Sequence, residues 1–167
     1  ASPSAFDPEK LAWLNAQHLK LAAPRRLAEL LTPFLADLGL TPPEGARLAG
    51  LIELFRERAN GLKDMAEAMR FMLTPAVQLD YDPAAVARAL TEEGRGHVAA
   101  LAKIFRELAE FTAESIHTAM QGYVEGNGLK MKHVGPPLRV ALAGALAGPG
   151  LPEIMAWLGQ DESLARL

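Results

Sequence analysis

The feature that most constrains the fold of this chain is the absence of alternating apolar and polar residues, because no run shows the two-residue period of a half-buried strand. Alanine and leucine dominate, β-branched residues are sparse, and apolar residues recur at helical spacing. Since half of its 167 residues are apolar, the chain can bury a sizeable core. The sequence therefore predicts an all-α fold without a sheet.

Helix start and stop signals place the expected helices. Asp7-Pro8 and Asp82-Pro83 each combine an N-capping side chain with a proline suited to the first helical position. Residues 41–44 are expected to form a capping box, Gly94-Arg95-Gly96 to break a helix, and Thr112 to cap another. The expected helices cover about residues 8–19, 24–38, 44–59, 62–73, 83–93, 97–110, 113–126, 138–145, 151–158 and 162–167.

The chain is expected to divide into two helical subdomains. Residues 74–81 have an irregular pattern and lie between a Thr-Pro stop signal and the next helix start. We therefore predict an N-terminal helical subdomain over residues 1–75 and a C-terminal helical subdomain over residues 76–167.

Composition narrows the class of protein. A net charge of −3 argues against a sequence-blind nucleic-acid binder, which would be basic overall. The absence of cysteine excludes disulfides and thiolate metal sites and is compatible with a reducing cytosol. No apolar run is long enough to span a membrane, and the first residues do not resemble a signal peptide. We expect a soluble, cytoplasmic protein without a membrane partner and, since it begins with Ala1, a piece of a larger one.

No residue pattern indicates catalysis or metal binding. The four histidines, at positions 18, 97, 117 and 133, share no ligand spacing. The carboxylate pairs Glu92-Glu93 and Glu110/Glu114 are typical of solvated helix surface rather than of acid-base chemistry. We expect no catalytic residue, no metal and no cofactor in this chain.

A basic segment near the C-terminus is the clearest candidate binding surface. Residues 127–152 contain no Asp or Glu but carry Lys130, Lys132, His133 and Arg139. Basic side chains beside a helix start favour phosphate groups and carbonyl-rich base edges. Because the rest of the chain is acidic, we interpret this segment as a local RNA-contacting surface.

Arg58 is a second candidate. It is expected at the end of a helix, next to the Asn60-Gly61 turn, where the guanidinium can project toward a ligand. Standing alone, such an arginine would more commonly be a solvated helix-end residue.

Three motifs together resemble bacterial-type glutamyl-tRNA synthetase. They are Phe6-Asp7-Pro8-Glu9-Lys10-Leu11-Ala12-Trp13-Leu14-Asn15, Pro137-Leu138-Arg139-Val140-Ala141-Leu142 and Gly148-Pro149-Gly150-Leu151. They occur in the same order as in the C-terminal anticodon-binding half of that family, and the similarity covers essentially the whole chain. The resemblance implies an α-helical cage of two subdomains that follows a catalytic domain absent from this chain.

The resemblance also implies a function and roles for individual residues. The parent enzyme would join glutamate to tRNA with ATP and magnesium, so the partners are a glutamate tRNA and the catalytic domain of the same polypeptide. Arg58 would read the third anticodon base and help to reject glutamine tRNA. Arg139 and the turn containing Gly148, Pro149 and Leu151 would contact anticodon bases, as splayed loop bases are recognised by arginine forks and exposed main chain.

The sequence departs from the family pattern at a few positions and leaves two alternatives open. Ala143 and Gly148 replace residues that commonly carry hydroxyl groups, and Lys132-His133 stands where a Gly-Lys pair is common. The turn must therefore rely more on its main chain. The alternatives are the helical cage of a class I lysyl-tRNA synthetase and a helical scaffold that binds protein instead of RNA.

Overall fold

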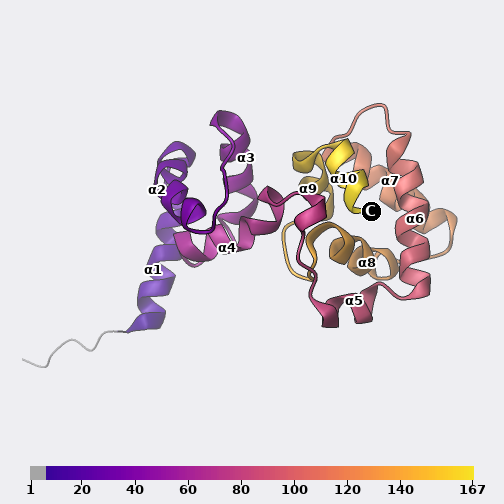
Figure 1. Ribbon diagram of the computed structural model, residues 1–167, viewed down its shortest axis with the longest axis horizontal. Coiled ribbons are helices and arrows are strands. Elements are labelled where there is room, and N and C mark those ends of the chain that lie inside the picture. Colours follow the sequence, from indigo (N-terminus) through magenta and orange to yellow (C-terminus); the bar gives the residue numbers. More distant parts are fainter. Residues whose placement is uncertain (1–6) are drawn as a thin grey trace, which may run out of the picture. The chain divides into compact units, whose positions relative to one another are not determined.

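The computed structural model describes residues 7–167, which form ten α-helices and one short 3₁₀ helix and contain no strand (Figure 1). The predicted all-α fold is confirmed. Phe6, the first residue of the N-terminal motif, lies outside the described residues. The chain divides into two compact units, one ending at Leu73 and the other running from Thr74 to Leu167.

The first unit is built from four helices. They are α1 (Pro8–Leu21), α2 (Pro24–Asp37), α3 (Gly45–Phe55) and α4 (Leu62–Leu73). Asp7 caps α1 by accepting hydrogen bonds from the Glu9 and Lys10 amides, as its sequence predicts. Helices α2, α3 and α4 pack against one another. The fully buried side chains of this core are Leu27, Leu31, Leu35, Leu51, Ile52, Met65 and Met69.

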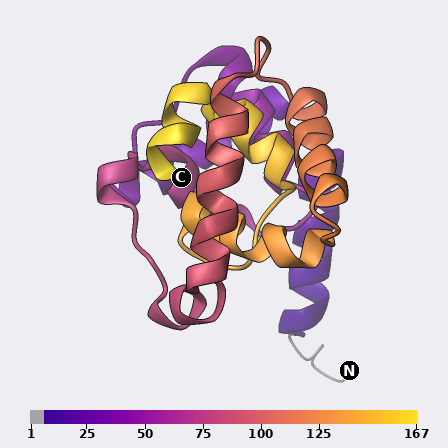
Figure 2. The same cartoon turned by 90° about the vertical axis from the view of Figure 1, so that its right-hand side faces the viewer.

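The second unit surrounds helix α8. Its elements are η1 (Ala76–Gln78), α5 (Pro83–Ala89), α6 (Glu92–Arg106), α7 (Ala113–Gly126), α8 (Met131–Ala143), α9 (Leu151–Leu158) and α10 (Gln160–Arg166). Helix α8 packs against α5, α6, α7, α9 and α10. Figure 2 shows α6 running the length of this unit, with α7 on one side and α10 on the other. The largest fully buried side chains are Leu101, Phe105, Ile116, Leu138 and Leu142.

Arg166 joins the two ends of the second unit. Its buried guanidinium donates to the carbonyl oxygens of Leu142 and Thr74, at 2.8 and 2.7 Å, and its Nε donates to Glu162 at 2.9 Å. A buried guanidinium is stabilised only when its donors are satisfied. Arg166 therefore fixes α10 to the end of α8 and to the first residue of the unit.

The predicted break at Gly94-Arg95-Gly96 is wrong. Helix α5 ends at Ala89, and α6 begins at Glu92 and continues through both glycines. The Thr91 hydroxyl caps α6 by accepting from the Gly94 amide at 3.1 Å. A Cβ on Gly94 would overlap the Ala89 carbonyl oxygen and press on Pro137. This glycine therefore permits close helix packing rather than ending a helix.

The predicted capping box at residues 41–44 is also wrong. Helix α3 begins at Gly45, and its N-cap residue Glu44 has no side-chain capping hydrogen bond. The physical reason is the Pro42-Pro43 pair, since a residue that precedes proline is disfavoured in the helical region. The helix also ends earlier than expected, at Phe55, and a turn carries the chain through Arg58.

The basic segment is helical, contrary to the expectation that a helix starts near Leu138. Helix α8 begins at Met131 and includes Pro136 and Pro137. His133 supports this start because its Nδ1 accepts a hydrogen bond from the Lys130 amide at 3.1 Å. This bond satisfies one of the amides that a helix start leaves without an intrahelical partner. Lys132 and His133 thus lie on the first turn of a helix rather than on a connecting segment.

Candidate nucleic-acid interface

Arg139 is held against the turn that precedes α9. Its side chain leaves α8, is partly buried, and donates from Nη1 to the Pro149 carbonyl oxygen at 2.7 Å. Gly148 lies directly against the same guanidinium, because a Cβ at that position would come within 3.1 Å of Nη1. The structure therefore brings together three of the predicted site residues, Arg139, Gly148 and Pro149.

The side chains of Pro149 and Leu151 face the interior. Both residues are buried, and only 6% of the Leu151 surface is exposed. Leu151 opens α9, whose N-cap residue Gly150 has no side chain with which to cap the helix. Glu153 folds back over Gly150, where a Cβ would overlap its carboxylate. The main chain of the turn, rather than its side chains, is thus the part suited to contact a ligand.

Lys130 and Lys132 lie at the start of α8. Lys130 is the N-cap residue, Lys132 is in the first turn, and both are exposed. Lys132 and Arg139 are seven residues apart, which places them on the same face of the helix about 10 Å apart along its axis. Pro136 lies between them on that face. This face, which we call the cationic stripe, consists of Lys132, Pro136 and Arg139.

Arg58 belongs to the first unit and has different surroundings. It is exposed in the turn after α3, where its amide donates to the Phe55 carbonyl oxygen at 2.9 Å. Within residues 7–167 its side chain has no ion-pair or hydrogen-bond partner. The nearby Arg56 is instead the structural arginine, because its guanidinium binds the carbonyl oxygens of Lys20 and Ala22. The sequence singled out Arg58 and gave no sign of the structural role of Arg56.

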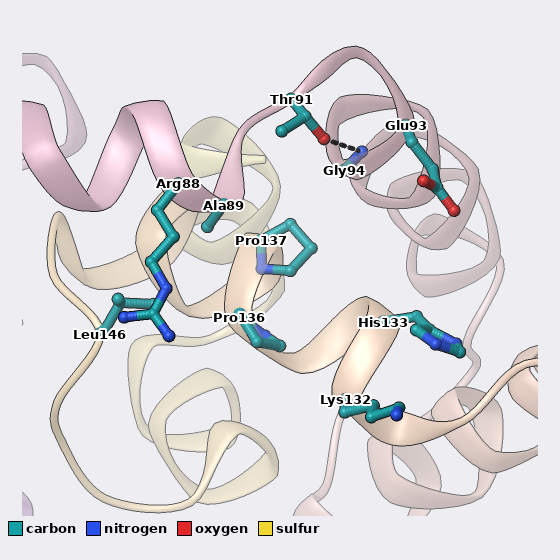
Figure 3. A pocket seen from close by; sticks show the side chains of 10 residues that line it. All are labelled: Arg88, Ala89, Thr91, Glu93, Gly94, Lys132, His133, Pro136, Pro137 and Leu146. Carbon is teal, nitrogen blue, oxygen red and sulfur yellow. Dashed lines mark hydrogen bonds between the residues drawn. The ribbon is translucent and has the colours of Figure 1, made fainter.

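A pocket beside the cationic stripe was not predicted (Figure 3). It has a volume of about 540 Å³ and lies among α5, the start of α6 and the first half of α8. Its lining includes the basic residues Arg88, Lys132 and His133, the apolar residues Pro136, Pro137 and Leu146, and the carboxylate of Glu93. We call it the Arg88 pocket. No sequence signal marks Arg88, which is a single arginine on a short helix.

The described residues offer neither a metal centre nor a membrane span. Among residues 7–167, no cluster of three or more histidine, aspartate and glutamate side chains is arranged to hold a metal ion. Within the same range, no helix is both long enough and apolar enough to cross a membrane.

Known proteins are similar to this chain in sequence and in fold. Residues 26–167 match the family described as an anticodon binding domain. The chain is 53% identical over all 167 residues to a glutamate–tRNA ligase of Nitratidesulfovibrio vulgaris (Hildenborough), and 47% identical over 166 residues to one of Oleidesulfovibrio alaskensis. It spans 36% of the length of each of these relatives.

A solved structure of a glutamate tRNA ligase has a similar fold. A crystal structure of a glutamate tRNA ligase from Elizabethkingia meningosepticum, in complex with its amino acid, is similar with a TM-score of 0.85 and 28% identity. The similarity covers 96% of this chain and 31% of that one. The likeness therefore extends through both units of the chain.

Proposed function

Because this chain belongs to the anticodon binding domain family, we propose that it is the anticodon-binding part of a glutamate–tRNA ligase. It would select glutamate tRNA for charging by a catalytic domain elsewhere in the same polypeptide, which would use ATP and magnesium. The chain would supply binding and selectivity, not chemistry. The named relatives support the glutamate enzyme over the lysyl alternative, since they are glutamate–tRNA ligases.

The observation that carries the proposal is the setting of Arg139. Its guanidinium is held by the Pro149 carbonyl oxygen at the edge of a turn whose main chain is suited to contact a ligand. A guanidinium has five N–H donors in a planar fork, so the bond to the Pro149 carbonyl oxygen also fixes the orientation of that plane at the edge of the turn. Such a fork is suited to base edges in an unstacked anticodon loop. Lys130 and Lys132 would meet the adjoining phosphates.

Selectivity would come from donors that only the correct base satisfies. A wrong base would leave an N–H donor of Arg139, or of the turn around Gly148, Pro149 and Leu151, desolvated and unpaired. That loss costs roughly 1–3 kcal/mol for each group. Arg58 would read the third anticodon base, and its lack of an intramolecular partner among residues 7–167 suits that role.

The test is binding of the 167-residue chain to a tRNA with the glutamate anticodon and to versions altered at each anticodon base. We expect weaker binding to the altered tRNAs and a loss of this difference in Arg58→Ala and Arg139→Ala. The matched control is Arg106→Ala, an exposed arginine in the last turn of α6. Equal binding of all tRNAs by the unaltered chain, or no binding, would contradict the proposal and favour the protein-binding scaffold.

A further inference from the structure

The Arg88 pocket lies next to the cationic stripe but is not explained by anticodon reading. Figure 3 shows Arg88 reaching from α5 toward Pro136 and Leu146, while Lys132 and His133 lie on the other side of Pro136. Helices α5 and α8 are more than forty residues apart in sequence, so the fold alone brings these basic side chains around one hollow.

The walls of the pocket are close-packed. Helix α5 rests on α8 through a buried cluster of Ala85, Ala89 and Val140. On the other side, the glycine at position 94 lets the first turn of α6 approach Ala89 and Pro137 without a gap. Because Arg88 immediately precedes the buried Ala89, its backbone is fixed at the rim of the pocket. The helices that line the hollow are thus tightly packed, and Leu146 of the turn after α8 completes the lining.

Within the part of the chain that the structure describes, the two permanently charged cations of the pocket do not stabilise the fold through side-chain hydrogen bonds or ion pairs. Among residues 7–167, the side chains of Arg88 and Lys132 have no hydrogen-bond or ion-pair partner. Arg95, on the neighbouring helix, contrasts with them because it donates to the Leu90 carbonyl oxygen at 2.8 Å. Two unpaired cations that face one pocket repel each other and together attract an anion.

His133 adds a ring N–H donor to these cations. Its Nδ1 accepts the Lys130 amide hydrogen, so in the neutral ring the proton is on Nε2. The ring lines the pocket and can offer that N–H to an oxygen acceptor. Glu93 is the one carboxylate among the lining residues. Its Oε1 lies 3.6 Å from Nε2 of His97, a largely buried histidine of the same helix.

We infer that the Arg88 pocket binds a backbone phosphate of the tRNA, as an extension of the cationic stripe beyond the anticodon bases. This inference rests on the proposed function and deepens it. A strand that meets Arg139 at the turn would follow the stripe past Pro136 to Lys132 and Arg88. A phosphate oxygen accepts from guanidinium, ammonium and imidazole N–H groups alike, and these are the donors that the pocket presents. The contact carries no sequence information.

The test uses Arg88→Ala in the 167-residue chain, with binding measured at several salt concentrations. Binding should weaken several-fold and equally for the glutamate tRNA and the anticodon-altered tRNAs. The slope of log affinity against log salt should decrease in magnitude by about 0.7 to 1, as expected for one lost phosphate contact. Glu93→Gln, which removes the opposing charge from the same pocket, should strengthen binding to every tRNA.

Matched variants separate this contact from a change in the fold. Arg88→Lys should retain most of the binding, because a phosphate accepts either cation. Arg106→Ala removes an arginine about 20 Å along α6 from Glu93 and should change neither affinity nor slope. Thermal unfolding of Arg88→Ala should match that of the unaltered chain, since Arg88 is exposed. Inorganic phosphate alone should bind no more tightly than the millimolar range.

The possible failures are distinguishable. If Arg88→Ala leaves affinity and slope unchanged while Arg139→Ala still abolishes anticodon preference, the pocket inference is wrong and the proposed function stands. A changed anticodon preference in Arg88→Ala would contradict a backbone contact. Micromolar binding of inorganic phosphate would assign the pocket to a small anion instead. Absence of anticodon preference in the unaltered chain would contradict the proposed function itself.

Discussion

The turn after α3 and the turn before α9 use their arginines in different ways. In the first unit, Arg56 binds the carbonyl oxygens of Lys20 and Ala22. Arg58 lies in the exposed turn and does not take part in these bonds. In the second unit, Arg139 is both bonded to the Pro149 carbonyl oxygen and proposed to contact RNA. In the first unit, one arginine therefore holds the main chain and another is proposed to contact RNA. In the second unit, Arg139 has both roles.

This difference predicts whether substituting the arginine at each site changes the stability of the fold as well as RNA binding. A substitution at Arg58 removes a side chain without a partner among residues 7–167, so its effect should be confined to binding. A substitution at Arg139 also removes the bond that holds the turn, so binding and stability should change together. The following substitutions test this contrast by disturbing one of the two turns at a time.

The largest effect is expected from Gly144→Ala, which disturbs the second unit without touching an arginine. Gly144 ends α8 with a φ of 74°, and a Cβ there would overlap the Asp80 carbonyl oxygen. We expect the second unit to lose more than about 2 kcal/mol of stability. Urea unfolding can follow Trp157 of α9 in a Trp13→Phe background, because the chain contains only these two tryptophans.

The control for this prediction is the same substitution at an open site. Gly122 lies inside α7, and a Cβ there would meet nothing within 4 Å. Gly122→Ala should therefore raise stability by about 0.5–1 kcal/mol, because alanine favours a helix more than glycine does. Equal destabilisation by both substitutions would show that the contact with Asp80 is not the cause.

A smaller effect is expected from Arg56→Ala in the first unit. The substitution leaves the Lys20 and Ala22 carbonyl oxygens without this donor and removes the 2.6 Å ion pair with Glu53. A loss of about 1–2 kcal/mol is expected. Arg58→Ala should change stability by less than about 0.5 kcal/mol. Hydrogen exchange of the α3 and α4 amides measures both variants, and an equal loss would remove the distinction between the two arginines.

Much of the fold could be predicted from sequence because its signals are local. The helix caps at Asp7, Asp82 and Thr112 act within three residues, and all three are confirmed. The resemblance to the anticodon-binding half of glutamyl-tRNA synthetase is confirmed by the family match and the relatives. One error arose where tertiary packing decides, because Gly94 resembles a helix breaker but serves the contact of α6 with Ala89. The error at residues 41–44 had a local cause, the Pro42-Pro43 pair.

The candidate site was less predictable because its contacts join distant segments. The basic segment indicated Lys130, Lys132 and Arg139, but not the bond between Arg139 and the Pro149 carbonyl oxygen. Arg88 carries no signal of its own, since its position beside Pro136 depends on how α5 packs on α8. The roles of these residues in RNA binding remain predictions.

A loss of stability smaller than that of Gly144→Ala is expected at Arg139, and a double-mutant cycle can isolate its contact with the turn. Arg139→Ala should cost at least about 1 kcal/mol, because it removes the hydrogen bond to the Pro149 carbonyl oxygen. Gly148→Ala should also destabilise the unit, partly through its φ of 148° and partly because the new Cβ would lie 3.1 Å from Nη1 of Arg139. The destabilisation caused by the contact between the new Cβ and Nη1 disappears when Arg139 is replaced by alanine. Gly148→Ala should therefore cost less in the Arg139→Ala background, as measured by Trp157 fluorescence in urea. Strict additivity would mean that the guanidinium does not rest on the turn in solution, and Arg139 would then resemble Arg58 rather than contrast with it.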